Sequence, residues 1–480
     1  MTLVPTSTNA RVHALLFRRS RPMAARLSLL TQGPRSRAAG GARKGRAHLD
    51  LSVDGGYAFL LLLAMLFSQT AGALSGVAMT VLPVSYMIVR RRKLGAVVAS
   101  QWPLFLPPAV ALLSVLWSEA PDVSGKYAIE LWLTVAAGIG LAVAERPTAV
   151  LKGICLAFVL YVGACLRYGH ATFDGAGDTA FLGLAGGKNL IADIASTGVM
   201  ISLAVCFIAI RQRSLFWWML SSFALALELY VALQARSAGA ILALSAATCA
   251  FVAFAALGQA PRALRVAATL TMLVIAGIIA AVSRDIGAAL INYGAQLFDK
   301  DATLTGRTYL WYRAQDLISE KPWFGRGFYA FWRQGNTDAE GLWQYAGIVG
   351  RGGFNFHNAL IELTVQLGLV GAGVFALIAL VGLASLVWRF MRKPSLPLCF
   401  WMTLFLYAMI RAPTESVGQA PFYYSTVLIF AGAAFGLARP ARPLAHKRYR
   451  AQILRLRPRT GPVQGQRRPF ARPVRPALAR

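Results

Sequence analysis

The sequence predicts an all-α, polytopic membrane protein of about twelve transmembrane helices, with one large external loop and both termini in the cytoplasm. Three observations support this fold class. The 480 residues are 57% hydrophobic and only 14% charged, whereas a soluble domain has roughly 25% charged residues. Apolar runs near the 20 residues that a membrane-spanning helix needs follow one another along the chain. Basic residues are concentrated in alternate connecting loops.

Twelve apolar runs are the predicted spans, and the first two are short and lie close together. The runs cover residues 56–69, 71–89, 97–117, 127–144, 149–168, 189–210, 214–234, 238–257, 265–283, 358–387, 397–411 and 421–438.

The orientation follows from basic residues in the short loops. With the N-terminus inside, the cytoplasmic loops hold 13 of them and the opposite loops hold 5, which is the expected bias. The cytoplasmic set is Arg90, Arg91, Arg92, Lys93, Arg146, Lys152, Arg211, Arg213, Arg262, Arg265, Arg389, Arg392 and Lys393. The opposite set is Lys126, Arg167, Lys188, Arg236 and Arg411. Long loops cross regardless of charge, so the loop 284–356 is predicted to lie outside.

Two basic tails flank the membrane domain, which is assigned to residues 55–438. Residues 1–54 hold 10 basic and 2 acidic side chains, and residues 439–480 hold 13 basic and none acidic. We predict that both tails are disordered and are held on the cytoplasmic side by the positive-inside bias and by anionic lipid. Nucleic-acid binding is the rival interpretation of such tails. It is disfavoured here because the tails lack interleaved aromatic residues and a fold.

His357 is the leading candidate for chemistry outside the membrane. Of the five histidines, only His170 and His357 fall on the predicted external side, and histidine is the usual general base near neutral pH. If a helix begins at His357, then Gly368 lies about 20° from it and Gly371 about 40° away on the other side. One stripe would then carry the histidine and two glycines that allow close helix packing. An interfacial histidine above an ordinary packing stripe is the alternative.

Two arginines are predicted to hold an anion. The apolar spacing after Arg307 indicates an amphipathic helix that Pro322 ends, with Thr305 as its N-cap. Arg307 would lie in the first turn, where backbone N–H groups and the helix dipole favour a phosphate; a solvated surface arginine is the alternative. Arg236 lies in a tight turn between two apolar spans, where a charge is costly, and this favours a function.

Further polar residues lie near the predicted external ends of spans. Lys188 and Asn189 begin the sixth span, and Asp193 is one turn below Asn189 on the same face. Arg411 and Glu415 bracket the turn between the last two spans. The acids at membrane depth, Asp193, Glu228 and Glu362, each fit as structural partners of an arginine or lysine.

The external loop is rich in aromatic residues, which suits a membrane-interface belt or a sugar-stacking surface. Asp299-Lys300-Asp301 fits the pattern of metal-dependent glycosyltransferases only weakly, and we interpret it as a solvated turn. The five cysteines lie in apolar runs without zinc-ligand spacing. No metal and no cofactor is predicted.

Together these residues resemble the O-antigen ligase and polymerase superfamily of bacterial envelope glycosyltransferases, over roughly residues 55–438. The most specific motif is His-Asn, nine residues, Gly-x-x-Gly, met by His357, Asn358, Gly368 and Gly371. The pattern from Thr305 to Trp311, with the later Pro322, Gly325, Gly327 and Phe331-Trp332, is similar to the exopolysaccharide-polymerase branch. Lys188-Asn189 and Arg236-Ser237 also match family motifs.

The resemblance implies a polymerase in the bacterial inner membrane, with the loop 284–356 in the periplasm. The donor would be a glycan on undecaprenyl pyrophosphate, and His357 would take a proton from the acceptor hydroxyl. Arg307 and Arg236 would offset the charge on the leaving pyrophosphate without a metal, and the anomeric centre would invert. The expected substrate-binding residues are Lys188, Asn189, Asn358, Arg411 and Glu415.

Membrane lipid and other polysaccharide-assembly proteins are the remaining expected partners, and nucleic acid is not expected. Two alternatives stay open. A ligase would transfer a finished glycan to another acceptor with the same donor chemistry. A transporter or lipid flippase would also fit twelve spans with intramembrane charges, although the sequence shows no inverted repeat and no matching broken helices.

Overall fold

The computed structural model describes residues 52–91, 97, 100–173, 179–272, 274, 307–351 and 354–438. Most of both predicted tails, the turn at 299–301 and the predicted N-cap Thr305 lie outside the described residues.

Regular structure in the described residues is mostly helical, as the composition predicts, and an antiparallel two-stranded hairpin departs from the predicted all-α fold. The N-terminal elements are α2 (Val53–Leu66), α3 (Ser68–Ala71), α4 (Ala73–Val89), the 3-10 helix η1 (Trp102–Phe105), α6 (Leu106–Leu113), the 3-10 helix η2 (Ser114–Leu116), α7 (Pro121–Val143), α8 (Pro147–Tyr168), β1 (His170–Phe173) and β2 (Thr179–Gly183). The C-terminal elements are α9 (Lys188–Gln212), α10 (Leu215–Gln234), α11 (Ala238–Leu257), α13 (Arg307–Glu320), α14 (Thr337–Tyr345), α15 (Ala359–Arg392), α16 (Leu396–Arg411) and α17 (Tyr424–Leu437).

Among the described residues, six helices are long and apolar enough to cross a membrane: α7, α8, α9, α10, α11 and α15. Five shorter apolar segments, namely α2, α4, the stretch from η1 to η2, α16 and α17, coincide with other predicted spans. The chain is therefore a multi-pass membrane protein. The predicted span at 265–283 runs past the described residues, so the total of twelve stays a prediction.

The predicted span at 97–117 is not one continuous helix. It is divided into η1, α6 and η2. Prolines 103, 107 and 108 lie within it, and a proline lacks the backbone N–H that continues an α-helix. The apolar pattern placed this segment correctly but gave no warning of its breaks.

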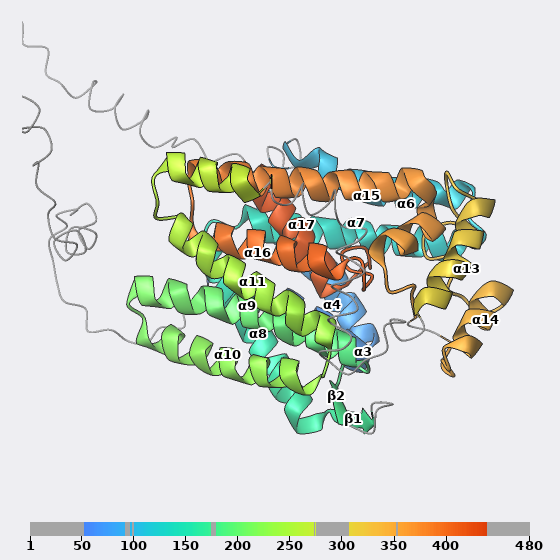
Figure 1. The fold of residues 1–480 in the computed structure, drawn as a ribbon, viewed down its shortest axis with the longest axis horizontal. Coiled ribbons are helices and arrows are strands. Elements are labelled where there is room, and N and C mark those ends of the chain that lie inside the picture. The colour runs from blue at the N-terminus through green and yellow to red at the C-terminus, as the bar shows by residue number, and fades with distance from the viewer. Residues whose placement is uncertain are drawn as a thin grey trace, which may run out of the picture. The chain divides into compact units, whose positions relative to one another are not determined.

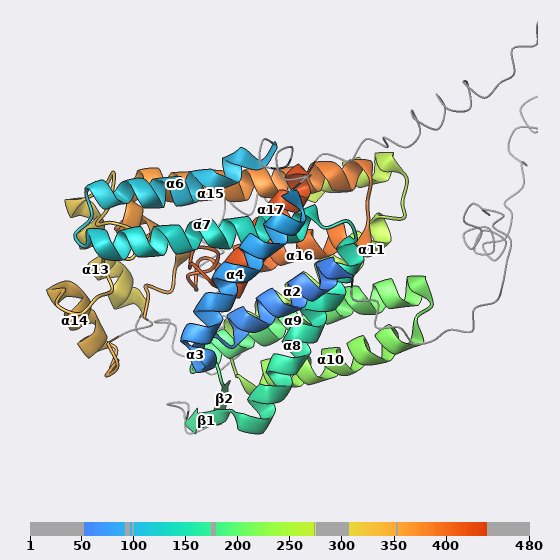
Figure 2. The same ribbon diagram turned by 180° about the vertical axis from the view of Figure 1, so that it is seen from behind.

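Figures 1 and 2 show the helices in two groups. Helices α6, α7, α15 and α17 pack together, α8, α9 and α10 pack together, and α16 contacts members of both groups. Small residues allow the closest approaches, as expected inside a membrane. A Cβ added at Gly138 of α7 would lie 2.8 Å from the Val427 carbonyl oxygen of α17.

Loops that were predicted to share a membrane side do meet in space. At one end, the Trp117 indole donates to the Phe324 carbonyl, and Glu119 pairs with Arg326 at 2.7 Å. At the other end, Lys152 donates to the Gln212 side chain at 2.9 Å. The grouping of these loops is confirmed, and the side of the membrane that each end faces stays a prediction.

The described part of the predicted external loop, residues 307–351 and 354–356, folds against the start of α15. Helices α13 and α14 lie near the start of α15 (Figure 1) and share a small apolar core with the neighbouring loop and with α15. Helix α13 begins at Arg307 and ends at Glu320, two residues before Pro322, as predicted. The buried members of this core are Leu310, Ala314, Leu317, Phe331, Ala339, Leu342, Trp343, Phe356 and Val365.

The continuous stripe predicted from His357 to Gly371 is wrong. Asn358 caps α15, so His357 precedes the helix, and its backbone is left-handed with φ 50°. The helix is also interrupted at Gly368, where φ is 65° and ψ is −173°. A side chain at Gly368 would meet the Trp323 carbonyl at 2.2 Å, so this glycine admits a loop rather than a neighbouring helix.

The break in α15 is filled by the chain around residues 322–327. The Leu369 and Val370 N–H groups donate to the carbonyls of Pro322 and Trp323, and the Arg326 N–H donates to the Val365 carbonyl. A helix interruption at membrane depth persists only where other groups satisfy its backbone. The expectation concerned broken helices in matching halves of the chain, and the single break in α15 does not test it.

Candidate active site

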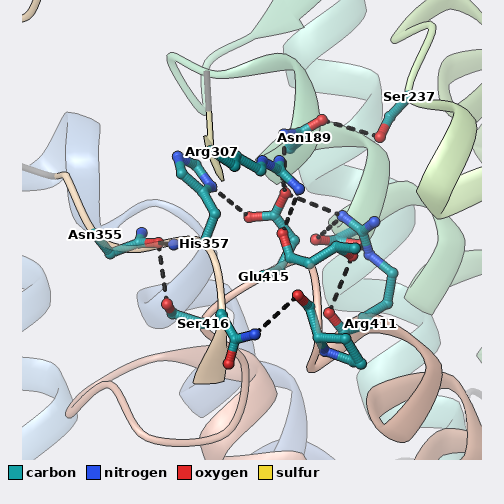
Figure 3. A network of polar contacts seen from close by, with 12 residues as sticks. Asn189, Ser237, Arg307, Asn355, His357, Arg411, Glu415 and Ser416 are labelled. Carbon is teal, nitrogen blue, oxygen red and sulfur yellow. Dashed lines mark hydrogen bonds and ion pairs between the residues drawn. The ribbon is translucent and has the colours of Figure 1, made fainter. Parts of the chain in front are cut away.

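Glu415 lies in the turn between α16 and α17, and side chains from four segments converge on it (Figure 3). His357 Nδ1 is 3.0 Å from its Oε2. Arg307 and Asn189 donate to its Oε1 at 2.8 and 2.9 Å. Arg411 lies 3.6 Å from the same oxygen. Five residues that the sequence singled out separately are therefore brought together around one carboxylate.

The histidine is held on three sides. Its backbone N–H donates to Asn355 Oδ1 at 2.7 Å, and that oxygen also accepts from Ser416 at 3.0 Å. Glu415 accepts the Nδ1 proton, which leaves the lone pair on Nε2. Figure 3 shows this second ring nitrogen pointing away from Glu415. The His357 side chain is 24% exposed, so Nε2 is available to a substrate proton.

Asn358 fixes the start of α15 rather than the ring itself. Its Oδ1 accepts from the Leu360 and Ile361 N–H groups, as an N-cap does. Its side-chain amide donates to the Pro413 carbonyl at 3.1 Å. The His-Asn pair thus joins the helix that follows His357 to the turn that carries Glu415.

Arg307 bridges the external loop and the same turn. One guanidinium nitrogen donates to the Thr414 carbonyl at 2.7 Å while the other binds Glu415. Its side chain remains 14% exposed. The guanidinium has five N–H donors, so these two bonds leave others for a ligand.

Arg411 is buried and pairs with Asp193 of α9. The guanidinium binds both carboxylate oxygens, at 2.7 and 3.0 Å, and Tyr407 donates to the same acid at 2.5 Å. A Cβ at Gly239 would lie 2.6 Å from Arg411, which explains the glycine after the Arg236 turn. The expected basic partner of Asp193 is therefore confirmed.

The other two intramembrane acids bind neutral donors, in contrast to that expectation. Among the described residues, Glu228 accepts one hydrogen bond, from Ser202 at 2.7 Å. Glu362 accepts from the Trp332 indole, the Gln366 amide and the Phe356 N–H. Glu362 thus steadies the residue before His357.

The N-termini of α9 and α11 lie side by side next to Glu415. Ser237 donates to Asn189 Oδ1 at 3.0 Å. The capping residues, Gly187 and Ser237, make no side-chain bond to the helix N–H groups. Lys188 begins α9, and Arg236 precedes α11 with φ 50° and an exposed side chain. Free helix N–H groups and cations together favour an anion.

Sequence reasoning missed Asn355 and Ser416, which hold the His357 backbone. The Asn-x-His spacing was the available signal, because an asparagine side chain often accepts from the N–H two residues on. His170, the other candidate base, is an exposed residue of β1. Within the described residues, no group of three or more His, Cys, Asp or Glu side chains is arranged to hold a metal ion.

The electrostatics of the site favour an ionised Glu415. Burial alone would raise the pKa of this carboxyl. The hydrogen bond and charge of His357 and the charges of Arg307 and Arg411 outweigh burial, and they hold the pKa below its ordinary value. Glu415 is therefore a carboxylate at neutral pH, which fixes the His357 tautomer.

Part of the chain is similar to a known protein family. Residues 222–376 match the family described as O-antigen ligase. The matched range includes Arg236, Arg307 and His357, while Arg411 and Glu415 lie beyond its end. The network around Glu415 thus joins the matched residues to the helices on either side of them.

A curated relative extends the similarity over most of the chain. The exopolysaccharide production protein ExoQ of Rhizobium meliloti (strain 1021) is 28% identical over 376 residues. The alignment covers 77% of this chain and 85% of the relative. The superfamily resemblance, with its exopolysaccharide branch, is confirmed.

Proposed function

We propose that the chain is a glycosyltransferase of the bacterial inner membrane that polymerises glycan repeat units carried on undecaprenyl pyrophosphate. The observation that carries the proposal is the convergence of His357, Arg307 and Asn189 on Glu415. The match to the O-antigen ligase family and the similarity to an exopolysaccharide production protein support the substrate class.

In the proposed reaction, His357 Nε2 takes the proton of an acceptor sugar hydroxyl. The hydroxyl oxygen then forms a bond to the anomeric carbon of the donor. The bond from that carbon to the pyrophosphate oxygen breaks, and the carrier pyrophosphate leaves with the electron pair. Direct displacement inverts the anomeric centre. General base catalysis of this kind contributes roughly 10²–10⁴-fold.

The leaving pyrophosphate gains negative charge, and the site offers cations for it. We assign Arg307, Arg236, Lys188 and the free N–H groups of α9 and α11 to this anion, by electrostatic stabilisation. Asn189 orients Glu415 and lies beside the same helix ends. The site therefore has a base and an anion-binding wall next to each other.

Arg411 and Asn358 receive positioning roles in this proposal. Arg411 is 2% exposed and paired with Asp193, so it supports Glu415 from within. Asn358 holds the start of α15. Glu415 fixes the tautomer of His357 and stabilises its protonated form, which parallels the role of the acid in a catalytic triad.

Transfer of a finished glycan to a different acceptor is the second candidate, and the O-antigen ligase match favours it. Both reactions use the same donor, so the site residues do not separate them. The length of the carrier-linked glycan does. A strain that lacks a polymerase accumulates single repeat units on the carrier, whereas a strain that lacks a ligase accumulates long chains there.

The test is complementation of a deletion strain with wild type, His357→Ala and His170→Ala, with membrane levels measured. We expect long glycans from wild type and His170→Ala, and carrier-linked single units from His357→Ala. His170→Ala is the matched control because it removes the other external histidine. Long polymer from an expressed His357→Ala protein would contradict the assigned base and favour transport or scaffolding.

A further inference from the structure

A second group of polar side chains lies on α7, outside the network just described. The rings of Tyr127 and Tyr329 stack with centroids 4.5 Å apart. Glu130 is one helical turn after Tyr127, and Lys126 Nζ lies 5.3 Å from the Tyr127 ring. Tyr127, Glu130 and Tyr329 are each partly exposed. The proposed mechanism does not yet use any of them.

Glu130 is an unusual residue for a membrane-spanning helix. Its carboxylate makes no hydrogen bond or ion pair with any residue that the structure describes, and Lys126 acts on it only through space. An ionisable group inside a membrane span is costly and generally marks a functional site or pathway. The Glu130 carboxylate is therefore able to accept hydrogen bonds from a bound molecule.

Tyr329 is held in a strained backbone. Its φ is 59°, a left-handed value that a bulky residue rarely adopts. Neighbouring bonds maintain it: its N–H donates to Gln366 Oε1 at 3.1 Å, and Ser124 donates to the Phe328 carbonyl at 2.8 Å. The strain presents the ring to Tyr127 beside Glu130.

Hydrogen bonds connect this group to the His357 site. Gln366, which accepts from the Tyr329 backbone, donates to Glu362 at 2.7 Å. Glu362 accepts the N–H of Phe356, the residue before His357. On α7, Thr134 accepts the Phe422 N–H at 2.8 Å, from the turn that carries Glu415. The group on α7 therefore borders the proposed active site.

The position of the α7 group relative to the leaving group indicates the side from which an acceptor enters. Two of the three cations assigned to the pyrophosphate, Lys188 and Arg236, lie at the ends of α9 and α11, and the third, Arg307, begins α13, which contacts α15. Helix α7 belongs to the other group of packed helices (Figures 1 and 2). A displacement that inverts the anomeric carbon requires the incoming hydroxyl on the face opposite the leaving group. The α7 side is therefore where an acceptor would enter.

We propose that Tyr127, Glu130 and Tyr329 form the acceptor subsite, which binds a sugar ring of the growing glycan. The Glu130 carboxylate accepts hydrogen bonds from two sugar hydroxyls, and the tyrosines supply flat apolar faces with polar ends. This inference rests on the proposed function and deepens it, because it assigns the acceptor side of the same site.

The test separates acceptor binding from donor binding in protein reconstituted into liposomes. Initial rates are measured against a soluble acceptor, one repeat unit released from its carrier, and separately against the carrier-linked donor. Glu130→Gln is expected to raise the acceptor concentration at half-maximal rate by about tenfold, which corresponds to ~1.4 kcal/mol, with the donor dependence unchanged. Tyr329→Ala is expected to act in the same direction, and Tyr329→Phe more weakly.

Asp122→Asn is the matched control, because Asp122 is an exposed acid in the first turn of the same helix. It is expected to leave both dependences unchanged, and thermal melting confirms that each variant is folded. If wild type transfers glycan but Glu130→Gln and Tyr329→Ala keep its acceptor dependence, the acceptor subsite is wrong and the proposed function stands. If wild type itself forms no glycosidic bond, the proposed function fails first.

Discussion

Two carboxylates, Asp54 and Glu415, lie at opposite ends of the helices, and each binds an arginine. Asp54 is 1% exposed and accepts from Arg90, from Tyr86 at 2.8 Å and from the backbone N–H groups of residues 145 and 146. Glu415 accepts from the side chains of His357, Arg307 and Asn189. The difference lies in what else those partners can do.

Two of the partners of Asp54 are backbone N–H groups, and Arg90, its charged partner, also pairs with Glu145 at 3.4 Å. Together these partners tie α2, α4 and the turn between α7 and α8. The partners of Glu415 keep free donors and a free lone pair on partly exposed side chains. The same ion-pair chemistry thus makes a structural junction at one end and an organised reactive site at the other.

The largest effect expected in this comparison is on the rate of glycan transfer, which should fall when Glu415 is changed but not when Asp54 is changed. Glu415→Gln keeps the side-chain volume but removes the charge that orients and stabilises His357, so we expect transfer per folded molecule to fall by about tenfold or more, since a hydrogen bond to a charged group contributes about 1.5–3 kcal/mol. Asp54→Asn should keep the wild-type rate per folded molecule. Initial rates in liposomes, normalised to folded protein, measure both. Equal losses of transfer rate in the two variants would contradict the distinction between a structural Asp54 and a Glu415 that organises the reactive site.

The next effect concerns thermal stability, for which the larger loss is expected at Asp54. Asp54→Asn leaves Arg90 without its buried partner, and breaking a buried pair typically costs about 3–5 kcal/mol. Thermal unfolding in one detergent should show a clearly larger loss for Asp54→Asn than for Glu415→Gln, whose surroundings are partly open. A Glu415→Gln protein that melts earlier than Asp54→Asn would instead make Glu415 the main structural junction.

A smaller stability effect is expected at the break in α15, which shapes only the Glu415 end. Gly368→Ala places a methyl group against the Trp323 carbonyl at a positive φ. Gly→Ala stabilises by up to roughly 1 kcal/mol where the backbone is compatible, and it destabilises by more than that where the backbone is not. Gly368→Ala should therefore destabilise the protein by more than about 1 kcal/mol. Gly373→Ala is the control, since nothing lies within 4 Å of its added Cβ. Equal melting temperatures for the two variants would show that the loop at 322–327 yields easily.

The smallest effect is a pH dependence. The pKa of Glu415 is held below its ordinary value of 4.5 in the folded state. Its contribution to stability is therefore fully present above about pH 5 and is lost as the pH falls through the folded pKa. The stability difference between wild type and Glu415→Gln should shrink as the pH falls below 4.5. A difference that grows as the pH falls below 4.5 would reverse the assigned sign.

Sequence reasoning found much of the fold because the lipid interior imposes a length and a polarity on every span. It placed α9, α10, α11, α16 and α17 within a few residues of their ends. It assumed one helix from His357 onward and missed the break at Gly368, because the apolar pattern on both sides of a break is the same. The loop that fills the break comes from 40 residues earlier, and no local pattern reports such a contact.

The site shows the same limit. The residue types at His357, Arg307, Arg236 and Glu415 were visible because charge is rare in an apolar chain. Their convergence was not visible, because Glu415 lies 58 residues from His357 and 108 from Arg307. Asn355 and Glu362 accept backbone N–H groups and Ser416 donates to the Asn355 side chain, and only the folded loop creates these bonds. Sequence composition identifies the candidates, and packing decides which of them meet.

Glycosidic bond formation by the purified protein tests the central claim most directly. Wild type and His357→Ala are reconstituted with carrier-linked repeat units as the only substrate, and the products are separated by length. The account predicts a ladder of longer carrier-linked glycans with wild type and at least a hundredfold slower extension with His357→Ala. Extension at the wild-type rate by a folded His357→Ala protein would contradict it.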